Sequence, residues 1–489
     1  MITFDNSYAQ LPERFYSRLP PEPVSSPGII RVNAKLATQL GIDADWLASA
    51  EGLAVLAGNQ VPEHADPIAT VYAGHQFGSW NPQLGDGRAL LLGEVLDQGG
   101  HRYDIQLKGS GRTPYSRMGD GRAPLGPVLR EYIVSEAMAK LGVPTTRALA
   151  AVTTGDPVYR EEAVPGAVLA RVASSHIRVG TFQFFASRGD TEGLQLLANH
   201  VIERHFPDAA TAENPVLSML LQVIARQAAL VAHWQLLGFI HGVMNTDNML
   251  VSGETVDYGP CAFLDSFNPD KVFSSIDQGG RYAYRNQPGI AHWNLANLAQ
   301  ALLPILHESE ELAMEAAQMA VDRYPDLFLR SHIRGFGRKL GLKLEGEADE
   351  ILVQDLLTLL AETGSDFTLT FRRLADLATR KAPEQSVEDL YVLPEAFKPW
   401  VERWRERCSM ESTSEEERQR QMYIANPVFI PRNHLIEEAI RAAEDAGELD
   451  RFNKLVDVLD QPFRFDGNLA RYALPPEPEQ EVRQTFCGT

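Results

Sequence analysis

The stretch of sequence richest in chemistry is residues 241–260, HGVMNTDNMLVSGETVDYGP. Asn248 and Asp257 could offer hard oxygen ligands to Mg²⁺ or Mn²⁺, ions that bind a few protein oxygens and otherwise phosphate and water. Asp257 follows the apolar Val256, as a strand that leads into a metal-binding loop requires. Asn, Asp and Gly also favour ordinary turns, so a turn at Asp247 and a hairpin end at Asp257 are the alternative. The metal interpretation predicts phosphoryl or nucleotidyl transfer, which needs cations around the phosphates.

The same stretch resembles the catalytic core of a protein kinase. His241 and Asn248 stand seven residues apart, and an Asp-Tyr-Gly triplet beginning at Asp257 takes the place of Asp-Phe-Gly. Val243 occupies the position of the kinase's catalytic aspartate. Asn248 and Asp257 are nine residues apart, which is closer than expected in a protein kinase. The stretch therefore resembles a kinase site without its usual base.

A lysine and a glutamate lie upstream in the order that a kinase uses. Apolar and polar residues alternate through residues 102–108, which predicts a strand with Lys108 on its polar face. Residues 124–144 combine an early proline, helical apolar spacing and a Gly-Val-Pro stop, so we predict a helix with Glu131 in its first half. In a kinase such a pair points at the α- and β-phosphates. Glu136 is the alternative partner, and a solvated surface charge is the ordinary role of a lone strand lysine.

Two glycine-containing loops could bring backbone amides close to phosphate. The first supplies Gly85, Gly87 and Arg88 ahead of a strongly apolar strand pattern. The second, GSGRTPYSRMGDGRA, supplies Asp120 and Gly121. We predict that these five residues bind nucleotide, although simple hairpin chemistry explains the glycines equally well.

Arginines are the other candidate phosphate ligands. Arg171 and Arg178 lie in LARVASSHIRVGTFQFF, and a guanidinium fork suits a terminal phosphate better than an ammonium group does. We predict that both bind nucleotide, with surface arginines as the alternative. The arginines of the second loop either hold an anion or form a solvated basic turn, and spacing does not separate the two; they are Arg112, Arg117 and Arg122.

The elements that must position these residues change character along the chain. Short strand-like runs and glycine turns extend to about residue 185, and helical periodicity dominates beyond about residue 195. We predict an α+β protein with the bilobal fold of protein kinases. A mixed, β-rich N-lobe with an N-terminal extension spans 1–185. A helical C-lobe with a C-terminal extension and the metal and catalytic motifs spans 186–475, and 476–489 is a mobile tail.

Composition limits the partners and the compartment. The 489 residues carry a formal charge of −20, which repels nucleic acid and favours a monomer. No uninterrupted apolar run reaches the roughly 18 residues of a membrane span, and the N-terminus lacks the features of a secretory signal. Three cysteines are too few for a disulfide scaffold or a four-ligand zinc site. We expect a cytoplasmic protein that binds neither membrane nor nucleic acid.

Taken together, the motifs resemble the selenoprotein O family of kinase-fold proteins over nearly the whole chain. The stretches that carry the resemblance are YAGHQFG, QLKGSGRTPYSR, HGVMNTDNM, DYGP, NPVFIPRNHL and the terminal CGT. The resemblance implies a protein adenylyltransferase that uses ATP with Mg²⁺ or Mn²⁺ and binds the nucleotide reversed relative to ordinary kinases. AMP, rather than the γ-phosphoryl group, then moves to a Ser, Thr or Tyr hydroxyl of a protein, with self-modification as one outcome.

The resemblance also assigns roles to single residues. Asp247 corresponds to the family's proposed base, directly before the metal ligand Asn248, so that Val243 is no longer a defect. The resemblance also implies that Asp257 binds the metal and that Lys108 binds phosphate and pairs with Glu131. It implies that Arg171 and Arg178 bind the terminal phosphates.

Cys487 matches the position near the C-terminus where some family members carry selenocysteine. An accessible cysteine there makes redox control chemically reasonable. Relatives that form an intramolecular disulfide use a cysteine in the loop after the metal motif, whereas this chain has serines there, in NPDKVFSSID. Cys261 lies nearer the motif, and a small packed apolar role is the more common one for such a cysteine.

Three other functions remain open at this stage. The first is an ATP-binding pseudokinase scaffold, which Val243 suggests and the joint presence of Lys108, Glu131, Asn248 and Asp257 opposes. The second is an ordinary phosphotransferase whose base has moved to Asp247. The third is transfer of UMP rather than AMP.

Overall fold

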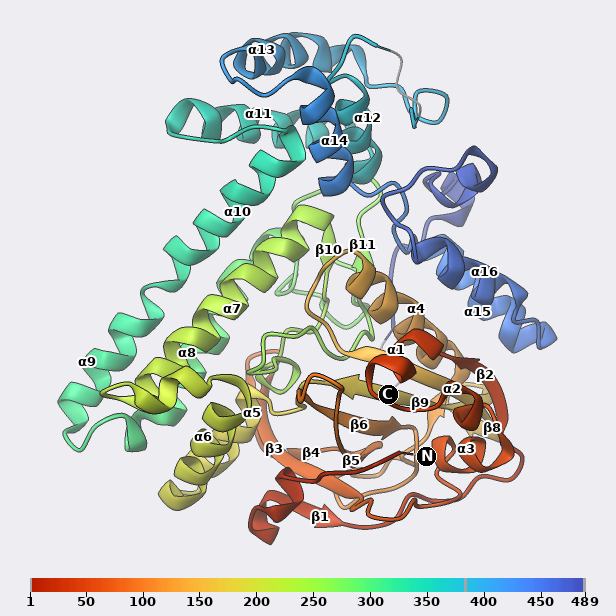
Figure 1. Cartoon of the computed structure of the whole chain (residues 1–489), viewed down its shortest axis with the longest axis vertical. Helices are drawn as coiled ribbons and strands as arrows, with labels where there is room; N and C mark the ends of the chain where they lie inside the picture. The colour runs from red at the N-terminus through yellow and green to blue at the C-terminus, as the bar shows by residue number, and fades with distance from the viewer. Residues whose placement is uncertain (1, 382–384, 487–489) are drawn as a thin grey trace.

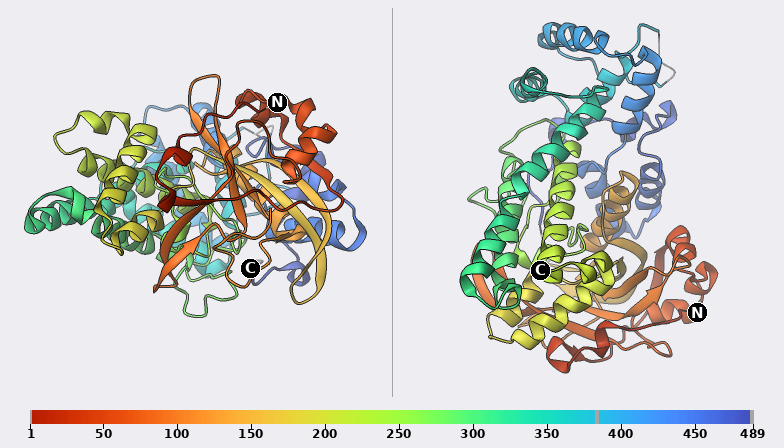
Figure 2. Two further views of the ribbon diagram at one scale, coloured as in Figure 1. Left: turned by 90° about the horizontal axis from the view of Figure 1, so that it is seen from below. Right: turned by 60° about the vertical axis from the view of Figure 1, so that its left-hand side comes forward.

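The computed structural model describes residues 2–381 and 385–486 of the chain. Residues up to 173 form a large antiparallel sheet with a few helices, and helices dominate the remainder. Figure 1 shows the sheet at the base of the molecule with long helices rising from it, and Figure 2 gives two further views. The predicted α+β class is confirmed.

The sheet has the order β1-β3-β5-β6-β9-β8-β2, with β4 paired to β3 and β7 to β9. The strand predicted at 102–108 is β6 (Arg102–Lys108), between β5 (Ala89–Leu96) and β9 (Ala163–Ala173). Its polar face is covered rather than solvated, since Asp104 and Gln106 are buried. The other strands of the sheet are β1 (Tyr16–Arg18), β2 (Gly28–Val32), β3 (Ile68–Gln76), β4 (Ser79–Gly85), β7 (Ala123–Pro124) and β8 (Arg147–Tyr159).

The helix predicted around Glu131 is α4 (Leu125–Lys140), and it is buried on almost every side. One side packs on β8 and β9, and the other packs on α15 (Asn433–Ala446) and α16 (Asp450–Leu459). Polar contacts add to this packing, because the Gly126 amide donates to Glu444 at 3.0 Å and Arg130 pairs with Glu437. The C-terminal helices therefore hold α4 against the sheet.

The helical part is organised around α7 (Pro215–Leu237), which packs against α8 (Gln287–Leu306) and α10 (Tyr324–Leu340). Asn214 caps the start of α7, and Gly238 ends it with a φ of +71°, in the left-handed region that favours glycine. A short strand pair, β10 (Phe239–Ile240) with β11 (Ala262–Phe263), follows. The remaining α-helices are α1 (Ala34–Gln39), α2 (Ala44–Leu47), α3 (Ala50–Leu56), α5 (Val179–Ala186), α6 (Thr191–His205), α9 (Glu310–Val321), α11 (Glu347–Thr363), α12 (Phe367–Asp376), α13 (Lys398–Ser409) and α14 (Glu415–Ala425).

By length and composition alone, α7 could cross a membrane, with a mean hydropathy of 1.5 over its most apolar window. The sequence analysis did not predict this helix as a membrane span, because it counted only uninterrupted apolar residues. A mean hydropathy can stay high when a few polar residues are scattered through the helix. Of that window, 56% is buried inside the protein, as in the core helix of a globular protein. The expectation of no membrane partner stays a prediction.

The predicted boundaries at residues 185 and 475 also stay predictions. The last strand of the sheet, β9, ends at Ala173, and α5 begins at Val179 and extends across the first boundary. In the predicted tail, the Thr485 amide donates to the Phe273 carbonyl at 2.7 Å, and its hydroxyl donates to the Pro260 carbonyl at 2.6 Å. This part of the tail therefore lies against the segment that follows the Asp-Tyr-Gly triplet.

A fully buried arginine ties the C-terminal extension to the helical part. Arg432, in the stretch NPVFIPRNHL, contacts Asp265 at 2.5 Å and Asp366 at 2.8 Å, and it donates to the Ala473 carbonyl at 2.9 Å. Asp265 lies just after β11, and Asp366 caps the start of α12. One guanidinium thus joins three separate segments of the chain.

We expect Arg432→Met to lower the free energy of unfolding by about 3–5 kcal/mol, because it leaves two carboxylates without their buried cation. Denaturant titration followed by tryptophan fluorescence measures the change. Arg403→Met is the matched control, since Arg403 is half exposed and pairs with Asp355 at the surface, and it should change the value by no more than about 0.5 kcal/mol. Equal effects of the two substitutions would contradict the anchoring role.

Candidate active site

The structure brings Lys108 and Glu131 together at the end of β6. The lysine Nζ, on the last residue of β6, lies 2.5 Å from Oε2 of Glu131, in the first half of α4. Glu136, the alternative partner, instead contacts Arg147 at 2.7 Å and accepts a hydrogen bond from Asn33. The lysine of the strand is therefore partly buried and paired, not a solvated surface charge.

Three cations converge on Asp257. Its Oδ1 lies 2.7 Å from Arg171 and 3.3 Å from Lys108, and its Oδ2 lies 2.7 Å from Arg178. Arg171 also contacts Glu131 at 3.0 Å, and both arginines are almost completely buried. We call these three cations and the two carboxylates of Glu131 and Asp257 the cation cluster. The alternative of surface arginines is wrong for Arg171 and Arg178.

The electrostatics of the cation cluster favour an anionic ligand. Burial alone would raise the pKa of Asp257, but Arg171 and Arg178 hold it well below its usual value. Burial would likewise raise the pKa of Glu131, and Lys108 and Arg171 keep it lowered. Within the cluster three cations face two ionised carboxylates, and the buried carboxylates of Asp86 and Asp247 also act on Arg178. Guanidinium and ammonium groups gathered in this way suit a phosphate ligand.

The backbone at Asp257 is itself unusual. Its φ is +61°, in the left-handed region that a residue other than glycine seldom adopts, at a cost of order 1 kcal/mol. His241 supports this turn, since its Nε2 lies 2.8 Å from the carbonyl of Val256. The chain is therefore bent so that the carboxylate of Asp257 faces the arginines.

Asp247 lies on a short 3₁₀ turn (Thr246–Asn248) that faces β3. Its Oδ2 accepts a hydrogen bond from Gln76 at 3.2 Å, and its carbonyl accepts one from Arg178 at 2.6 Å. Its buried Oδ1 has no hydrogen-bond partner among the described residues. Burial raises the pKa of Asp247 to about 6, although Arg178 opposes the shift. This carboxylate, with one oxygen free, can accept a proton from a hydroxyl brought against it.

Sequence reasoning missed the residues that hold Asp247 in place. A Cβ on Gly74 would lie 2.5 Å from Asp247 Oδ1, so only glycine lets the strand approach the carboxylate this closely. The Tyr72 ring lies under the Arg178 guanidinium, 4.8 Å from ring centre to Cζ. Gly74 and Gln76 belong to the stretch YAGHQFG. Gly74 was the one residue there that could have indicated a close approach of the backbone to another group.

Asn248 and Asp257 carry oxygens of the kind that bind a divalent ion, and in this structure both Asp257 oxygens contact cations of the cluster. The Asn248 side-chain amide donates to the Val243 carbonyl at 3.1 Å, which fixes the amide group. No group of three or more His, Cys, Asp or Glu in the described part of the chain could hold a metal by itself. Mg²⁺ is commonly bound by one or two protein oxygens plus substrate phosphates, and these two residues offer that number.

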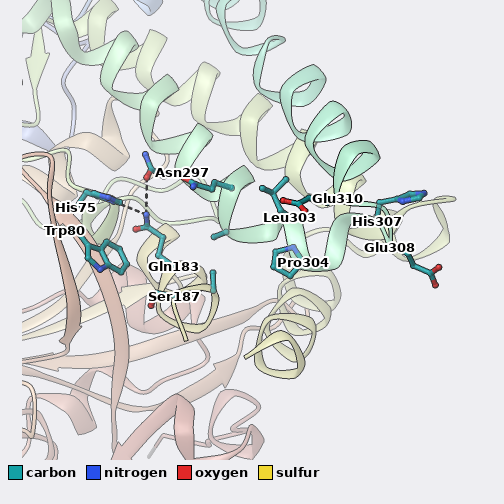
Figure 3. A pocket seen from close by; sticks show the side chains of 13 residues that line it. His75, Trp80, Gln183, Ser187, Asn297, Leu303, Pro304, His307, Glu308 and Glu310 are labelled. Atoms are coloured by element: carbon teal, nitrogen blue, oxygen red, sulfur yellow. Dashed lines mark hydrogen bonds between the residues drawn. The ribbon is translucent and has the colours of Figure 1, made fainter. Parts of the chain in front are cut away.

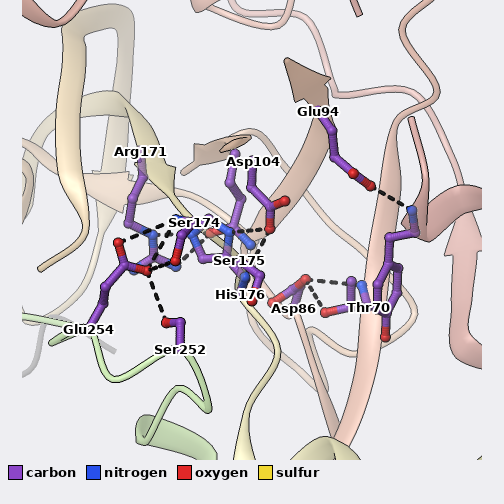
Figure 4. A network of polar contacts seen from close by, with 12 residues as sticks. Thr70, Asp86, Glu94, Asp104, Arg171, Ser174, Ser175, His176, Ser252 and Glu254 are labelled. Carbon is purple, nitrogen blue, oxygen red and sulfur yellow. Dashed lines mark hydrogen bonds and ion pairs between the residues drawn. The ribbon is translucent and has the colours of Figure 1, made fainter. Parts of the chain in front are cut away.

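In the segment between sheet and helices, residues 174–178, several polar groups are bonded within the protein (Figure 4). We call this segment the interlobe linker. The Ser174 amide and hydroxyl donate to Glu254 at 3.1 and 2.5 Å, and the His176 amide donates to Asp104 at 2.9 Å. The Ile177 carbonyl accepts from the amide of residue 251 at 3.0 Å. These groups are therefore already paired within the protein.

The predicted glycine loops lie together and pack on one another. A Cβ on Gly85 would meet the Tyr115 ring at 2.3 Å, and one on Gly87 would meet the Tyr115 carbonyl at 2.8 Å. The carbonyl of Arg88, ahead of β5, accepts from the Gly109 amide at 2.7 Å. These glycines thus have a packing role in the structure, and their predicted contact with phosphate stays a prediction.

Asp120 and Gly121 lie further out on the second loop. Asp120 pairs with Arg160 at 2.8 Å, and Gly121 packs against the backbone of Gly111. The structure thus places Asp120 in a surface ion pair rather than among the contacts of the cation cluster. The loop arginines contact protein groups: Arg112 the Gly119 carbonyl, Arg117 the side chain of Gln76, and Arg122 the Glu22 carbonyl.

Cys487 lies outside the described residues, so its predicted redox role is untested. Cys261 is buried, as expected for a packed cysteine.

The site lies where the sheet meets the helical part. It contains a paired lysine and glutamate, two buried arginines and an aspartate with a left-handed backbone. Transfer enzymes bind nucleotide phosphates with sites of this kind. Residues 1–460 match the family described as "Protein adenylyltransferase SelO". The chain belongs to this SelO/YdiU family. It is a protein nucleotidyltransferase, with ATP and proteins as the substrates that family membership implies.

Bacterial relatives match along their whole length. "Protein nucleotidyltransferase YdiU" of Nitrobacter hamburgensis is 57% identical over 488 residues, which is all of this chain and 96% of the relative. Proteins of the same description from Rhodopseudomonas palustris and Rhizobium meliloti are each 56% identical over 486 residues, 99% of either chain.

We expect Gly74→Ala to slow AMP transfer by about a hundredfold, because the added methyl group displaces the Asp247 carboxylate and misplacement by about 1 Å can have that effect. A fixed-time assay with ATP labelled on the α-phosphate measures the rate, and calorimetry should show ATP affinity nearly unchanged. Gly289→Ala is the control, since a Cβ there meets nothing within 4 Å. Transfer by Gly74→Ala at the parent rate would rule out a catalytic role for Asp247.

Proposed function

We propose that the protein transfers AMP from ATP to a Ser, Thr or Tyr hydroxyl of proteins, with the nucleotide reversed relative to an ordinary kinase. The observation that carries this proposal is the convergence of three largely buried cations in the cation cluster. The terminal phosphates carry most of the nucleotide's charge, and Arg171, Arg178 and Lys108 would neutralise them away from water. The α-phosphate then lies on the outer side, toward Asp247.

The interlobe linker supports the reversed orientation. A base that pairs with a backbone segment needs free amides and carbonyls, and several of the linker's groups are bonded to Glu254, Asp104 and the segment around residues 249–251. A base that used these groups would have to break their hydrogen bonds. The part of the site formed by the cation cluster and the interlobe linker therefore suits phosphates better than it suits a purine.

The kinase-like bilobal fold belongs to this proposal. A lysine on a central strand, paired with a glutamate on the next helix, is the arrangement of a kinase N-lobe, and Asn248 and Asp257 follow in the helical part, as in a kinase C-lobe. A divalent ion held by Asn248 and Asp257 would neutralise phosphate charge as it develops.

In the proposed reaction, Asp247 accepts the proton of the acceptor hydroxyl. The hydroxyl oxygen forms a bond to the α-phosphorus, the bond from that phosphorus to the bridging oxygen breaks, and pyrophosphate leaves. Lys108, Arg171 and Arg178 hold the departing charge. Val243, which is buried and apolar, takes no part in proton transfer.

We also propose a cytoplasmic monomer that uses Mg²⁺ or Mn²⁺ and binds no nucleic acid, as the acidic composition suggests. Self-modification is part of the proposal. Transfer from UTP is the second candidate reaction, because the cation cluster contacts phosphates and does not select the base.

The deciding experiment supplies ATP labelled on either the α- or the γ-phosphate, with each metal, and separates the proteins under denaturing conditions. We expect label only from the α-position. Asp257→Ala should reduce it by at least about a hundredfold, since it removes a metal ligand and the partner of three cations. Asp208→Ala, an exposed aspartate on a short turn, is the control.

Each other result selects an alternative. Label only from the γ-position would make the protein an ordinary phosphotransferase with its base at Asp247. No label with intact ATP binding would make it a scaffold. UTP labelled on the α-phosphate, run in parallel, tests UMP transfer.

A further inference from the structure

The three arginines of the second glycine loop, GSGRTPYSRMGDGRA, have different surroundings. Arg122 pairs with a glutamate at 3.5 Å, and Arg112 donates to the Gly119 carbonyl at 2.9 Å, which closes the loop on itself. Arg117 instead reaches across to β3, where its Nη2 lies 3.4 Å from Gln76 Oε1. Arg117 is exposed, and no carboxylate pairs with it among the residues that the structure describes.

Gln76 joins Arg117 to the candidate base. Its Nε2 donates to Asp247 Oδ2 at 3.2 Å, and its Oε1 faces the guanidinium of Arg117. An amide between an anion and a cation takes this orientation, because its NH₂ group can only donate and its oxygen can only accept. One amide group therefore separates the carboxylate of the base from an exposed arginine.

This contact lies on the face of β3 that turns to the site. Side chains alternate along a strand, so His75 and Gln76 point to opposite faces of β3. His75 lines a groove of about 680 Å³ on one face (Figure 3), and Gln76 turns to Asp247 on the other. Arg117 reaches the strand from the side of the base.

The backbone at Arg117 is strained and anchored. Its φ is +55°, in the left-handed region that costs free energy for a residue other than glycine. The Gly119 amide donates to the Ser116 carbonyl at 2.8 Å, so Arg117 is the first central residue of a tight turn, where a positive φ favours glycine. The Ser116 hydroxyl donates to the Gly87 carbonyl and ties the turn to the first glycine loop. An arginine thus occupies a fixed position that suits glycine better.

Hydrogen bonds continue from the base to the cation cluster. The Asp247 carbonyl accepts from Arg178 at 2.6 Å, and Arg178 contacts Asp257 at 2.7 Å. The base therefore lies between a group of buried cations and one exposed cation. A guanidinium fork suits phosphate oxygens, and its present contact with Gln76 is long for a hydrogen bond. Exchange of that contact for a phosphate oxygen would cost little.

We propose that Arg117 is a further catalytic residue, which binds the phosphate that is transferred. This rests on the proposed function, in which that phosphate is the α-phosphate of ATP and Asp247 takes the proton of the acceptor hydroxyl. The hydroxyl oxygen forms its bond to the α-phosphorus, the bond to the bridging oxygen breaks, and pyrophosphate leaves with the electron pair. Arg117 donates to a non-bridging oxygen of the α-phosphate as negative charge develops there. The transferred group and the leaving group thus have separate cations.

The test begins with Arg117→Gly, which removes the guanidinium and suits the left-handed backbone, so the unfolding temperature should not fall. With ATP labelled on the α-phosphate, we expect transfer to be at least about a hundredfold slower. Calorimetry should show ATP binding about tenfold more weakly, since a charged hydrogen bond is lost. Pyrophosphate should bind as it does to the parent, because the cation cluster holds it. Arg117→Lys keeps the charge without the fork and should lie between the two.

Two further variants separate contact with phosphate from other effects. Met118→Ala changes the next residue of the same turn, which is 95% exposed, and it should keep the parent's rate and affinity. Gln76→Ala breaks the link to the base but leaves the guanidinium, so ATP affinity should stay near that of the parent. Arg117→Gly/Gln76→Ala should then bind ATP as weakly as Arg117→Gly and transfer more slowly than Gln76→Ala.

Three results would overturn the proposal. The first is unchanged ATP affinity in Arg117→Gly, and the second is an equal loss in Met118→Ala. The third is a double variant no slower than Gln76→Ala, because Arg117 would then act only by positioning the base.

The parent protein tests the proposed function by itself, with ATP labelled on the α- or the γ-phosphate. Label only from the γ-position would contradict AMP transfer, and loss of that label with weaker ATP binding in Arg117→Gly would still support Arg117 as the ligand of the transferred phosphate. Label from the α-position at the parent rate in Arg117→Gly would support AMP transfer and overturn the role of Arg117. With no label at all, the ATP affinity of Arg117→Gly still decides whether Arg117 binds the nucleotide.

Discussion

The site depends on one carboxylate, that of Asp257, which contacts three cations. Lys108 and Arg171 come from the sheet, Arg178 from the interlobe linker, and Asp257 from the helical part. None of the three cations could remain buried without a counter-charge. The site therefore forms only when the sheet and the helical part come together at Asp257. The backbone of Asp257 is left-handed in this arrangement, which is a local strain.

The cation cluster and Asp247 have different chemistry. At the cation cluster the protein offers buried donors, which suit a highly charged ligand that stays in place. At Asp247 it offers a buried carboxylate with one oxygen that has no hydrogen-bond partner among the described residues. Gly74 connects the two by letting β3 approach the catalytic turn, so a strand of the sheet forms one wall of the acceptor side.

Local pattern predicted the elements well and the long-range contacts poorly. Alternation and helix-end signals were enough to place Lys108 on a strand and Glu131 on the next helix, because these signals lie within a few residues of one another. Nothing in the sequence showed that Gly74 faces Asp247 or that Thr485 bonds to the Phe273 carbonyl, since those partners are more than 150 residues apart and meet only through packing. Gly85 and Gly87 resembled phosphate-binding glycines, and the structure shows them packed against Tyr115.

The position of α4 has a consequence for how the enzyme can be controlled. The sheet on one side and α15 and α16 on the other leave this helix no free face, and Glu437 and Glu444 hold its first turns. An enzyme whose glutamate-bearing helix could swing would have an active and an inactive state separated by that movement. Here the helix is packed on both sides, and the lysine–glutamate pair is assembled without a ligand. Control by a swing of α4 would therefore have to disrupt both packing interfaces.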